Sequence, residues 1–323
     1  MLKSIQLRLV QLKYSGASIG RDIRVEIEAL GQIFQSDHRI RPGQTVKIDR
    51  DAGRFETDKK TFQTDVLITV IEKDLLFNDS GGARVSVKVD THKGISQQFI
   101  SQVTVKERRS KLTKAKKIAV FEVMFEAAVY DVIRYVPDLD ESQGFLKARL
   151  EDSKAVQELP AYLKVKVERR DEKREYFTIL EGPYRGKLAS VATKDDGSSW
   201  LISHIEHEPM ALAKYSISQK GFFLNGKKYN TVDYPGAPWQ KGLYDIEIPD
   251  YFHEGGRNYL GEAKRAGTWF RIGHSGDRYL HAGGRSLGCM TVIEIKRWQE
   301  IYSALIKERK GDFLSVGEIE IID

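Results

Sequence analysis

Hydrophobic and polar residues alternate along much of the first hundred residues. Alternation with a period of two is typical of strands that bury one face of a sheet. The alternating runs lie at 5–9, 23–27, 62–71, 85–89 and 99–105. Turn-forming clusters such as Pro42-Gly43 separate them. Several short strands with this spacing predict a β-sandwich over residues 1–106.

The pattern changes after residue 106, where Gly144 is the only glycine between 107 and 181. The run 118–136 is apolar and β-branched with imperfect alternation, which fits a strand or a helix. Residues 140–159 are expected to be helical or looped. Strand-length runs follow at 162–168, 175–180, 187–193 and 200–206. We therefore expect a β-rich middle unit over 107–206.

The last part of the chain, 207–323, is rich in glycine, with fifteen of the 27 glycines from Gly221 onward. Glycine at this density indicates tight turns, and loops held on a rigid sheet often carry sites. One amphipathic helix is predicted within 294–308, before a closing strand at 316–322. Its apolar face holds Ile295, Trp298, Ile301, Tyr302 and Leu305, and we interpret that stripe as core packing. The expected fold is mainly β.

Charge and hydropathy exclude some classes of protein. The 323 residues are 41% hydrophobic with a formal net charge of +6, and no run of eighteen apolar residues predicts a membrane span. Lys106–Lys117 holds seven cations and one acid. We interpret this run as a solvated linker, with an anionic surface as the alternative. No nucleic-acid-binding motif accompanies it, so nucleic acid is not an expected partner.

The amino-terminal residues do not form a secretory signal, because they lack a continuous apolar stretch and a small-residue cleavage site. We therefore expect a protein made in the cytoplasm that reaches any other compartment by a specialised export route.

The single cysteine, Cys289, cannot form an internal disulfide or a CxxC metal site. It is either a small buried hydrophobe or a reactive thiol. Its neighbourhood, the segment 271–292 (RIGHSGDRYLHAGGRSLGCMTV), also contains two histidines and several glycines.

A cysteine nucleophile needs a base, a group that orients the base, and backbone donors for an oxyanion. His281 lies eight residues before Cys289, across a turn with Gly283, and is the expected base; His274 is the alternative. Gly288 is expected to bend the chain before the sulfur, with nearby amides facing the oxyanion. A neighbouring imidazolium is expected to favour the thiolate near neutral pH.

Three further side chains of this segment could contribute to the site. Arg278 and Arg285 are expected to favour the thiolate or to hold a substrate carboxylate. Ser286 belongs to the site, or it caps a turn.

The Ser286-x-Gly288-Cys289-Met290 core, preceded by a His-x-Gly element, resembles the motif of YkuD-type L,D-transpeptidases. The resemblance covers about the last hundred residues, and 234–248 is similar to a strand of that family. It implies that Cys289 attacks a peptidoglycan stem peptide and passes the acyl group to an amine or to water. It also implies that a backbone carbonyl, that of Ala282 or Gly283, orients the histidine.

The chain departs from that family at two positions. Leu287 stands in place of a second histidine, and Thr291 stands where many members carry an arginine that helps hold the stem peptide. The short gap between His281 and Cys289 resembles that of compact relatives, including antibacterial effectors that lack a secretion signal. Transpeptidase, carboxypeptidase and D-amino-acid exchange outcomes all stay open.

The segment 70–82 (VIEKDLLFNDSGG) resembles C2-like domains. Only Asp74 and Asp79 stand near one another in it, whereas calcium loops of C2 domains carry several spaced aspartates. We therefore expect a structural or docking module without calcium.

The resemblance to L,D-transpeptidases implies action on stem peptides in the periplasm or cell wall. A secretion apparatus and a cognate inhibitor protein are the expected partners, and neither a cofactor nor a metal is expected. The histidines of the HIEH segment, His204 and His207, do not have the spacing of a defined zinc site.

Two other interpretations stay open. In the first, the cysteine domain is catalytically inactive and the chain is a binding or docking protein. In the second, the protein is a cysteine peptidase of another fold, with His38 or His92 as a distant base.

Overall fold

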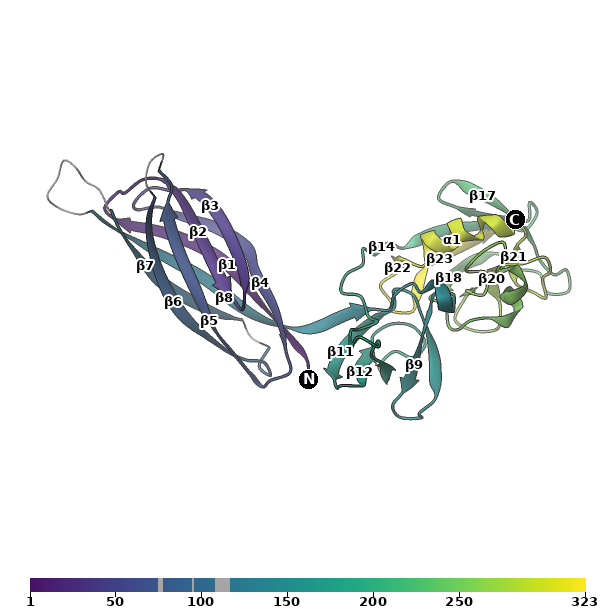
Figure 1. The fold of residues 1–323 in the computed structure, drawn as a ribbon. Helices are drawn as coiled ribbons and strands as arrows, with labels where there is room; N and C mark the ends of the chain where they lie inside the picture. The colour runs from purple at the N-terminus through teal and green to yellow at the C-terminus, as the bar shows by residue number, and fades with distance from the viewer. Residues whose placement is uncertain (75–77, 95, 108–116) are drawn as a thin grey trace. The chain divides into compact units, whose positions relative to one another are not determined.

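The computed structural model describes residues 1–74, 78–94, 96–107 and 117–323. Its contacts divide the chain into two compact units, Met1–Val132 and Ile133–Asp323 (Figure 1). The protein is mainly β with one short α-helix, as the sequence predicts. The division into three parts stays a prediction, and most of the basic run 106–117 lies outside the described residues.

The first unit is a β-sandwich of two sheets. Its strands are β1 (Lys3–Gly16), β2 (Asp22–Ala29), β3 (Gln32–Arg39), β4 (Thr45–Thr57), β5 (Thr61–Glu72), β6 (Asp79–Asp90), β7 (Gln97–Lys106) and β8 (Ile118–Tyr135). Strands β7, β8, β1 and β4 form one sheet, and β3, β2, β5 and β6 form the other. The last residues of β8, from Ile133, belong to the second unit.

Alternation builds the core of this sandwich. Ile5, Leu7 and Leu9 on β1 are buried, and the residues between them are more exposed. The ambiguous run at 118–136 is a strand, because β8 pairs with β1 on one side and β7 on the other. Its alternate residues, including Phe121 and Phe125, enter the same core. Each such side chain stabilises the fold by about 1.5–3 kcal/mol.

The second unit contains a five-stranded sheet, which we call the middle sheet. Its strands, in the order β10, β9, β13, β12 and β11, are β9 (Phe145–Leu150), β10 (Val156–Pro160), β11 (Lys164–Arg170), β12 (Arg174–Ile179) and β13 (Leu188–Ala192). A 3₁₀ turn, η1 (Asp140–Ser142), precedes β9.

Two expectations for this region are wrong. Residues 140–159 form η1 and the β9–β10 hairpin instead of a helix or loop, because the hairpin pairs from Phe145 to Pro160. Left-handed Gln143 and Gly144 turn the chain into β9. Residues 200–206 form no strand, and Ile202 makes only an isolated bridge to Tyr135.

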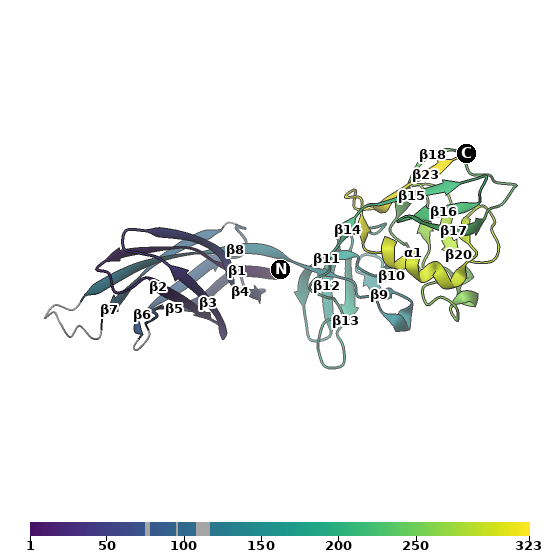
Figure 2. The ribbon, with the colours of Figure 1, turned by 90° about the horizontal axis from the view of Figure 1, so that it is seen from above.

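The second sheet of this unit, which we call the C-terminal sheet, has eight strands in the order β18, β23, β15, β16, β17, β21, β20 and β19. Figure 2 labels these strands except β21 and β19. They are β15 (Ala211–Ser216), β16 (Gly221–Leu224), β17 (Lys227–Val232), β18 (Gly242–Glu247), β19 (Phe270–Arg271), β20 (Tyr279–Ala282), β21 (Met290–Val292) and β23 (Ser315–Ile322). Short strands β14 (Glu208–Pro209) and β22 (Glu308–Arg309) pair separately.

The predicted amphipathic helix is shorter than expected. The 3₁₀ turn η3 (Ile295–Arg297) leads into α1 (Trp298–Leu305), and a further 3₁₀ turn, η2 (Glu254–Tyr259), lies between β18 and β19. The α1 residues predicted for the core are buried, and the Trp298 indole donates to the carbonyl of Arg265 at 2.8 Å. The stripe is therefore core packing.

Polar contacts join the middle sheet to the C-terminal sheet. Buried Arg265 donates to Asp138 at 2.6 Å and Asp140 at 2.7 Å, on either side of Leu139 at the start of η1. The carboxylate of Glu158 on β10 accepts from the Phe252 amide at 3.0 Å. Residues 133–206 and 207–323 thus share one compact unit.

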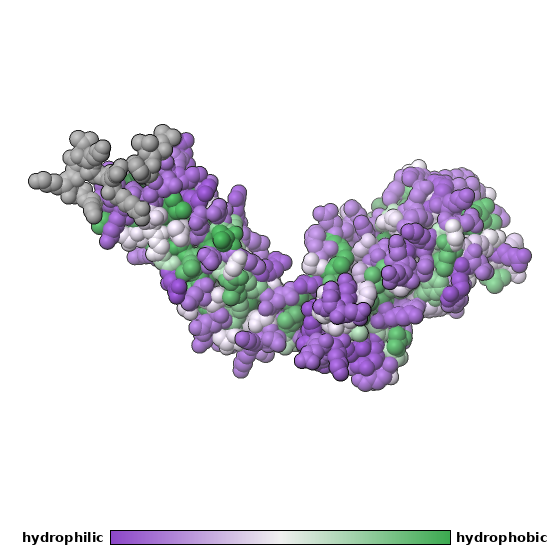
Figure 3. Space-filling view, viewed as in Figure 1, coloured by the Kyte–Doolittle hydropathy of each residue, from purple (hydrophilic) through white to green (hydrophobic). Residues whose placement is uncertain are grey.

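The surface is largely polar. Figure 3 shows hydrophilic residues over most of the visible face of each unit, with hydrophobic residues in small patches. Among the described residues, no helix has the length and apolar character required to cross a bilayer.

Candidate active site

The predicted base lies on β20, and the predicted nucleophile directly precedes β21, the parallel strand that pairs with β20. His281 pairs with Thr291, and Leu280 pairs with Met290. Cys289 lies in a bend just before β21, and its contacts are with Asp277, Arg278 and Tyr279. Among the described contacts, none joins Cys289 to His281, whose Nε2 meets Thr291 instead. The seven residues 283–289 make the connection, as the glycine-rich turn predicts.

His281 is buried with both ring nitrogens bonded. Its Nδ1–H donates to the carbonyl of Ala282 at 2.9 Å, so Nε2 carries the lone pair and accepts from the Thr291 hydroxyl at 3.0 Å. The Ala282 carbonyl is one of the two that the family resemblance implies. Burial lowers the pKa of His281 to about 4, against the raising effect of the Ala282 bond. The ring is therefore neutral near pH 7.

Gly283 leaves the space that this histidine needs. A methyl group at Gly283 would lie 3.2 Å from Cγ2 of Thr291 and 3.5 Å from the His281 ring. The Gly283 amide donates to the carbonyl of Val292 at 3.0 Å, which closes the turn after β20.

Cys289 is partly buried, and its thiol meets the carbonyl of Asp277 at 3.9 Å. Burial raises the pKa of Cys289, although the Tyr279 amide and the charge of Arg278 act in the opposite direction. The expectation of a resting thiolate beside an imidazolium is therefore wrong: burial disfavours the charged form of both groups. In the chain without substrate, the thiol and the imidazole are therefore both neutral near pH 7.

Ser286 fixes the bend before the sulfur. Its hydroxyl donates to the Cys289 carbonyl at 2.7 Å and accepts from the Gly288 amide at 3.1 Å. Gly288 has φ +126°, a conformation that favours glycine, as the predicted sharp bend requires. Because Ser286 engages the Gly288 amide, that amide does not face a substrate. Leu287, just before Gly288, is 90% exposed.

Arg278 acts as a clamp between two loops. Its guanidinium donates to the carbonyls of Gly288 at 2.7 Å and Ala237 at 2.8 Å, and it stacks on the Trp239 ring at 3.6 Å. Its hydrogen-bonding groups therefore hold backbone, while its charge reaches Cys289. Arg285 is exposed, and its carbonyl lies 3.3 Å from the Thr291 hydroxyl.

His274, the alternative base, belongs to an ion-pair cluster. Its Nε2 meets Asp245 at 2.5 Å and its Nδ1 meets Glu247 at 3.0 Å, both on β18. Although partial burial acts to lower it, these carboxylates raise the pKa of His274. Both nitrogens face carboxylates, so this side chain stays an ion-pair partner unless the cluster rearranges.

The same cluster contains a group of three potential metal ligands. Ligand atoms of Asp245, His274 and Asp312 lie within 4.8 Å of one another. The ammonium of Lys310 already contacts Asp245 at 2.5 Å, so a metal ion would compete with a resident cation. His207, from the HIEH segment, instead donates through Nδ1 to the carbonyl of Lys307 at 3.0 Å.

An aromatic stack supports the predicted base. The rings of Trp269 and His281 stack at 4.0 Å, and His253 stacks on Trp269 at 4.4 Å and on Tyr251 at 4.3 Å. His253 also contacts Asp250 at 2.9 Å. Sequence analysis missed this stack, and the aromatic-rich residues 251–253 were the available signal.

A cavity of about 410 Å³ lies beside the cysteine loop. Its lining includes Trp239, Tyr244, His274 and Arg278. Arg278 thus borders this cavity on one side and holds the Gly288 carbonyl on the other.

The comparisons with known proteins do not identify a family. No family model matches the chain, and no curated protein matches it. A C2 domain of plant Extended Synaptotagmin 1 resembles 39% of this chain over 92% of its own, at 11% identity and TM-score 0.23. Human GIVD cytosolic phospholipase A2 resembles 65% of this chain at 10% identity and TM-score 0.25, and this match spans 34% of the phospholipase chain. TM-scores of this size do not establish a common fold, so the C2-like resemblance stays a prediction.

Proposed function

We propose that the second unit catalyses cysteine-dependent acyl transfer or hydrolysis on peptidoglycan stem peptides. The observation that supports this most strongly is the bond from His281 Nδ1 to the Ala282 carbonyl. It fixes the tautomer in which Nε2 carries the lone pair, which is the form that a general base requires. The proposal requires the Cys289 thiol, just before the paired strand β21, to approach this nitrogen when substrate binds.

The first step is attack on a stem-peptide carbonyl. As the sulfur–carbon bond forms, the thiol proton passes to Nε2 of His281, and the carbonyl oxygen takes the negative charge. The Thr291 hydroxyl occupies Nε2 in the resting chain, but it has a second acceptor in the Arg285 carbonyl at 3.3 Å. Turning to that acceptor frees Nε2. The amides of Leu287 and Cys289 are then the oxyanion donors.

The second step completes the transfer. The imidazolium of His281 gives its proton to the departing amine, and the terminal D-amino acid leaves. An incoming amine or water then attacks the thioester, loses a proton to His281 and restores the thiol. Arg285 is placed to hold a substrate carboxylate, since it is exposed beside the turn. The acceptor decides among transpeptidation, carboxypeptidation and D-amino-acid exchange.

A second candidate is a catalytically inactive docking protein. Three observations favour it: Thr291 caps Nε2 of His281, burial raises the pKa of Cys289, and exposed Leu287 replaces a family histidine. In that case the cysteine domain is a scaffold, and the thiol reacts with a mild alkylating reagent only when the chain unfolds.

The direct test incubates purified tetrapeptide muropeptides with wild type, Cys289→Ala, His281→Gln and the control His207→Gln, followed by mass spectrometry. We expect wild type to release the terminal D-amino acid and Cys289→Ala to release none. His281→Gln should be slower by about 10²–10⁴-fold, the range for loss of a general base. The control should match wild type, because His207 contacts the Lys307 carbonyl and the Tyr135 ring and takes no part in the proposed chemistry.

Equal products from wild type and Cys289→Ala, or no product from either, would exclude the proposed reaction. With an acceptor D-amino acid present, exchanged, cross-linked and shortened products have different masses and distinguish the three outcomes. A chain with this activity would act in the periplasm or cell wall after specialised export. Its producer would need a cognate inhibitor protein.

A further inference from the structure

A second cavity, of about 510 Å³, opens on the middle sheet. This is a normal size for a small-molecule site. Its lining combines apolar or aromatic residues, among them Phe145, Val156 and Trp200, with the cations Lys147, Arg149 and Arg174 and one carboxylate, that of Glu141. No step of the proposed acyl transfer uses any of these residues.

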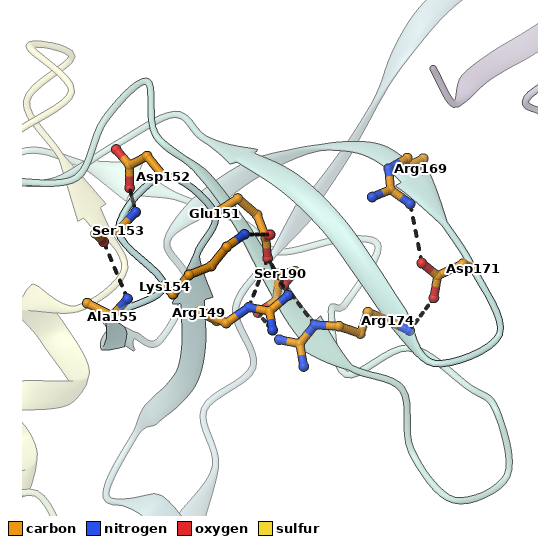
Figure 4. A network of polar contacts seen from close by, with 10 residues as sticks. All are labelled: Arg149, Glu151, Asp152, Ser153, Lys154, Ala155, Arg169, Asp171, Arg174 and Ser190. Atoms are coloured by element: carbon orange, nitrogen blue, oxygen red, sulfur yellow. Dashed lines mark hydrogen bonds and ion pairs between the residues drawn. The ribbon is translucent and has the colours of Figure 1, made fainter.

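The cations of this cavity differ in how far carboxylates neutralise them. The Glu151 carboxylate accepts from Arg149 at 3.0 Å and from Lys154 at 2.8 Å (Figure 4). Arg174 reaches the same network through the Ser190 hydroxyl, to which its Nε donates at 2.8 Å. Glu151 therefore pairs with Arg149 and Lys154. Lys147 lines the same cavity, is mostly exposed and lies 3.9 Å from Glu158.

The guanidinium of Arg174 meets no carboxylate among the residues that the structure describes. Its Nη2 donates to the Ser190 carbonyl at 2.8 Å, which holds the group in place without neutralising its charge. A fixed guanidinium at the edge of an apolar cavity is well suited to bind a carboxylate, because its orientation entropy is already lost.

The other wall of the cavity is suited to a ring. Trp200 is half-buried, with the ammonium of Lys194 5.1 Å from its ring centroid, and Val156 is 62% exposed. A sugar ring on Trp200 would use the ring surface that Lys194 leaves open. Phe145 lies buried behind them. Flat aromatic surface with a few placed polar groups is the usual composition of a ligand site. The combination favours a ligand that carries an apolar ring face and a carboxylate.

This cavity and the catalytic base share one framework. Leu139 and Ser142, at and beside η1, line the cavity, and Arg265 binds the neighbouring Asp138 and Asp140. Thr268 donates to the carbonyl of Gln143 at 3.2 Å. The next residue, Trp269, stacks on His281. A ligand in the cavity is therefore held by the same compact unit as Cys289.

We propose that this cavity is a second substrate subsite that binds an anionic muropeptide, with a sugar ring on Trp200 and a carboxylate on Arg174 and Arg149. The inference rests on the proposed function, since it takes the same polymer as the substrate. The subsite would hold the glycan strand while a stem peptide enters the cysteine site.

The test measures binding of a purified disaccharide-tetrapeptide to the full chain carrying Cys289→Ala, which prevents turnover. The chain has four tryptophans, so their indole N–H signals can be followed individually by NMR. We expect the Trp200 signal to shift, and Arg174→Gln to weaken binding by about tenfold or more, the scale of a charge-assisted hydrogen bond.

Arg169→Gln is the matched control. Arg169 lies on neighbouring β11, pairs with Asp171 at 3.3 Å and stacks on Tyr176 at 3.4 Å, outside the cavity (Figure 4). Its loss should change the dissociation constant by less than about twofold. Lys147→Gln is a second variant that leaves the fold intact, because Lys147 is mostly exposed; it should weaken binding in the same direction as Arg174→Gln.

Three results would overturn the subsite: an unmoved Trp200 signal, equal binding by Arg174→Gln and Arg169→Gln, or binding of a neutral chito-oligosaccharide as tight as that of the muropeptide. Preference of the cavity for vesicles of an anionic phospholipid would also overturn it.

Turnover of a free tetrapeptide separates the two proposals. If Cys289 releases the D-amino acid but the cavity variants bind muropeptide normally, only the subsite fails. If the cavity binds muropeptide but no D-amino acid is released, only the proposed reaction fails.

Discussion

Because Trp269 stacks on His281, we expect this base to stay neutral at pH values well below the ordinary pKa of histidine. The pKa of His281 is lowered to about 4 by burial, from an ordinary value of 6.5. This difference corresponds to about 3 kcal/mol. At pH 5.5, about 97% of a group with pKa 4 is neutral, against about 9% of a group with pKa 6.5.

Trp269→Leu removes the ring that lies 4.0 Å from the imidazole and admits water. We expect the pKa of His281 to rise by about 1–2 units, because desolvation is its main cause. The direction of this pKa shift also determines how the stability of the native chain depends on pH. The unfolded chain binds the proton near pH 6.5 and the native chain only near pH 4. Native wild type therefore loses stability as the pH falls through that window, and the variant should lose less.

The assay is an NMR titration of the His281 ring between pH 3.5 and 8 in wild type, Trp269→Leu and the control Trp200→Leu. Trp200 lines the cavity on the middle sheet, where its loss should leave His281 unchanged. The pH profile for D-amino-acid release should follow the NMR titration, with the acid limb near pH 4 in wild type and higher in Trp269→Leu. A wild-type titration near pH 6.5, or equal shifts in both variants, would refute burial as the cause.

Three other substitutions test separate parts of the two units. Gly288→Ala should cost about 1–3 kcal/mol, because the +126° φ is strained for alanine while its methyl group would meet only ordinary contact at 3.8 Å. Thermal unfolding measures this loss of stability, and an unchanged unfolding midpoint would contradict the prediction. Burial raises the pKa of Glu72 to about 7 from 4.5, so the native sandwich loses stability as the pH rises through that window. Glu72→Gln should therefore stabilise the first unit by up to about 3 kcal/mol at pH 8 and by little at pH 4.5 in denaturant titrations; an equal gain at both would argue against titration of Glu72. Arg265→Leu leaves Asp138 without its buried partner and should destabilise the second unit by about 3 kcal/mol or more. Calorimetry should show a lower transition for that unit only, and a shift in the first unit instead would show that the ion pair has another role.

The alternation of hydrophobic and polar residues was sufficient to predict the strands that bury one face. β1, β2 and β5 follow the alternating runs because every second side chain enters the core. β3 was not predicted, since its residues are mostly exposed and polar and its pairing with β2 decides the structure. In the same way, pairing with β10 makes β9 a strand, although its sequence FLKAR also suits a helix.

The candidate site could be predicted as far as its parts lie close in sequence. Cys289 and His281 are eight residues apart, and glycines mark the turn between them. Trp269 and His253 could not be assigned to the site, because their stacking depends on tertiary packing. The protonation states were inverted for the same reason: burial, which no local pattern gives, lowers the pKa of His281 and raises that of Cys289.

The central claim, that Cys289 attacks a stem-peptide carbonyl with His281 as base, is tested most directly by the intact mass of the protein after brief exposure to a tetrapeptide muropeptide. The account predicts an adduct equal to the muropeptide minus its terminal D-amino acid, mapped to Cys289 and absent from Cys289→Ala. His281→Gln should form it more slowly. An unmodified wild-type chain, with a thiol that a mild alkylating reagent labels only after denaturation, would contradict the claim and leave the docking protein as the function.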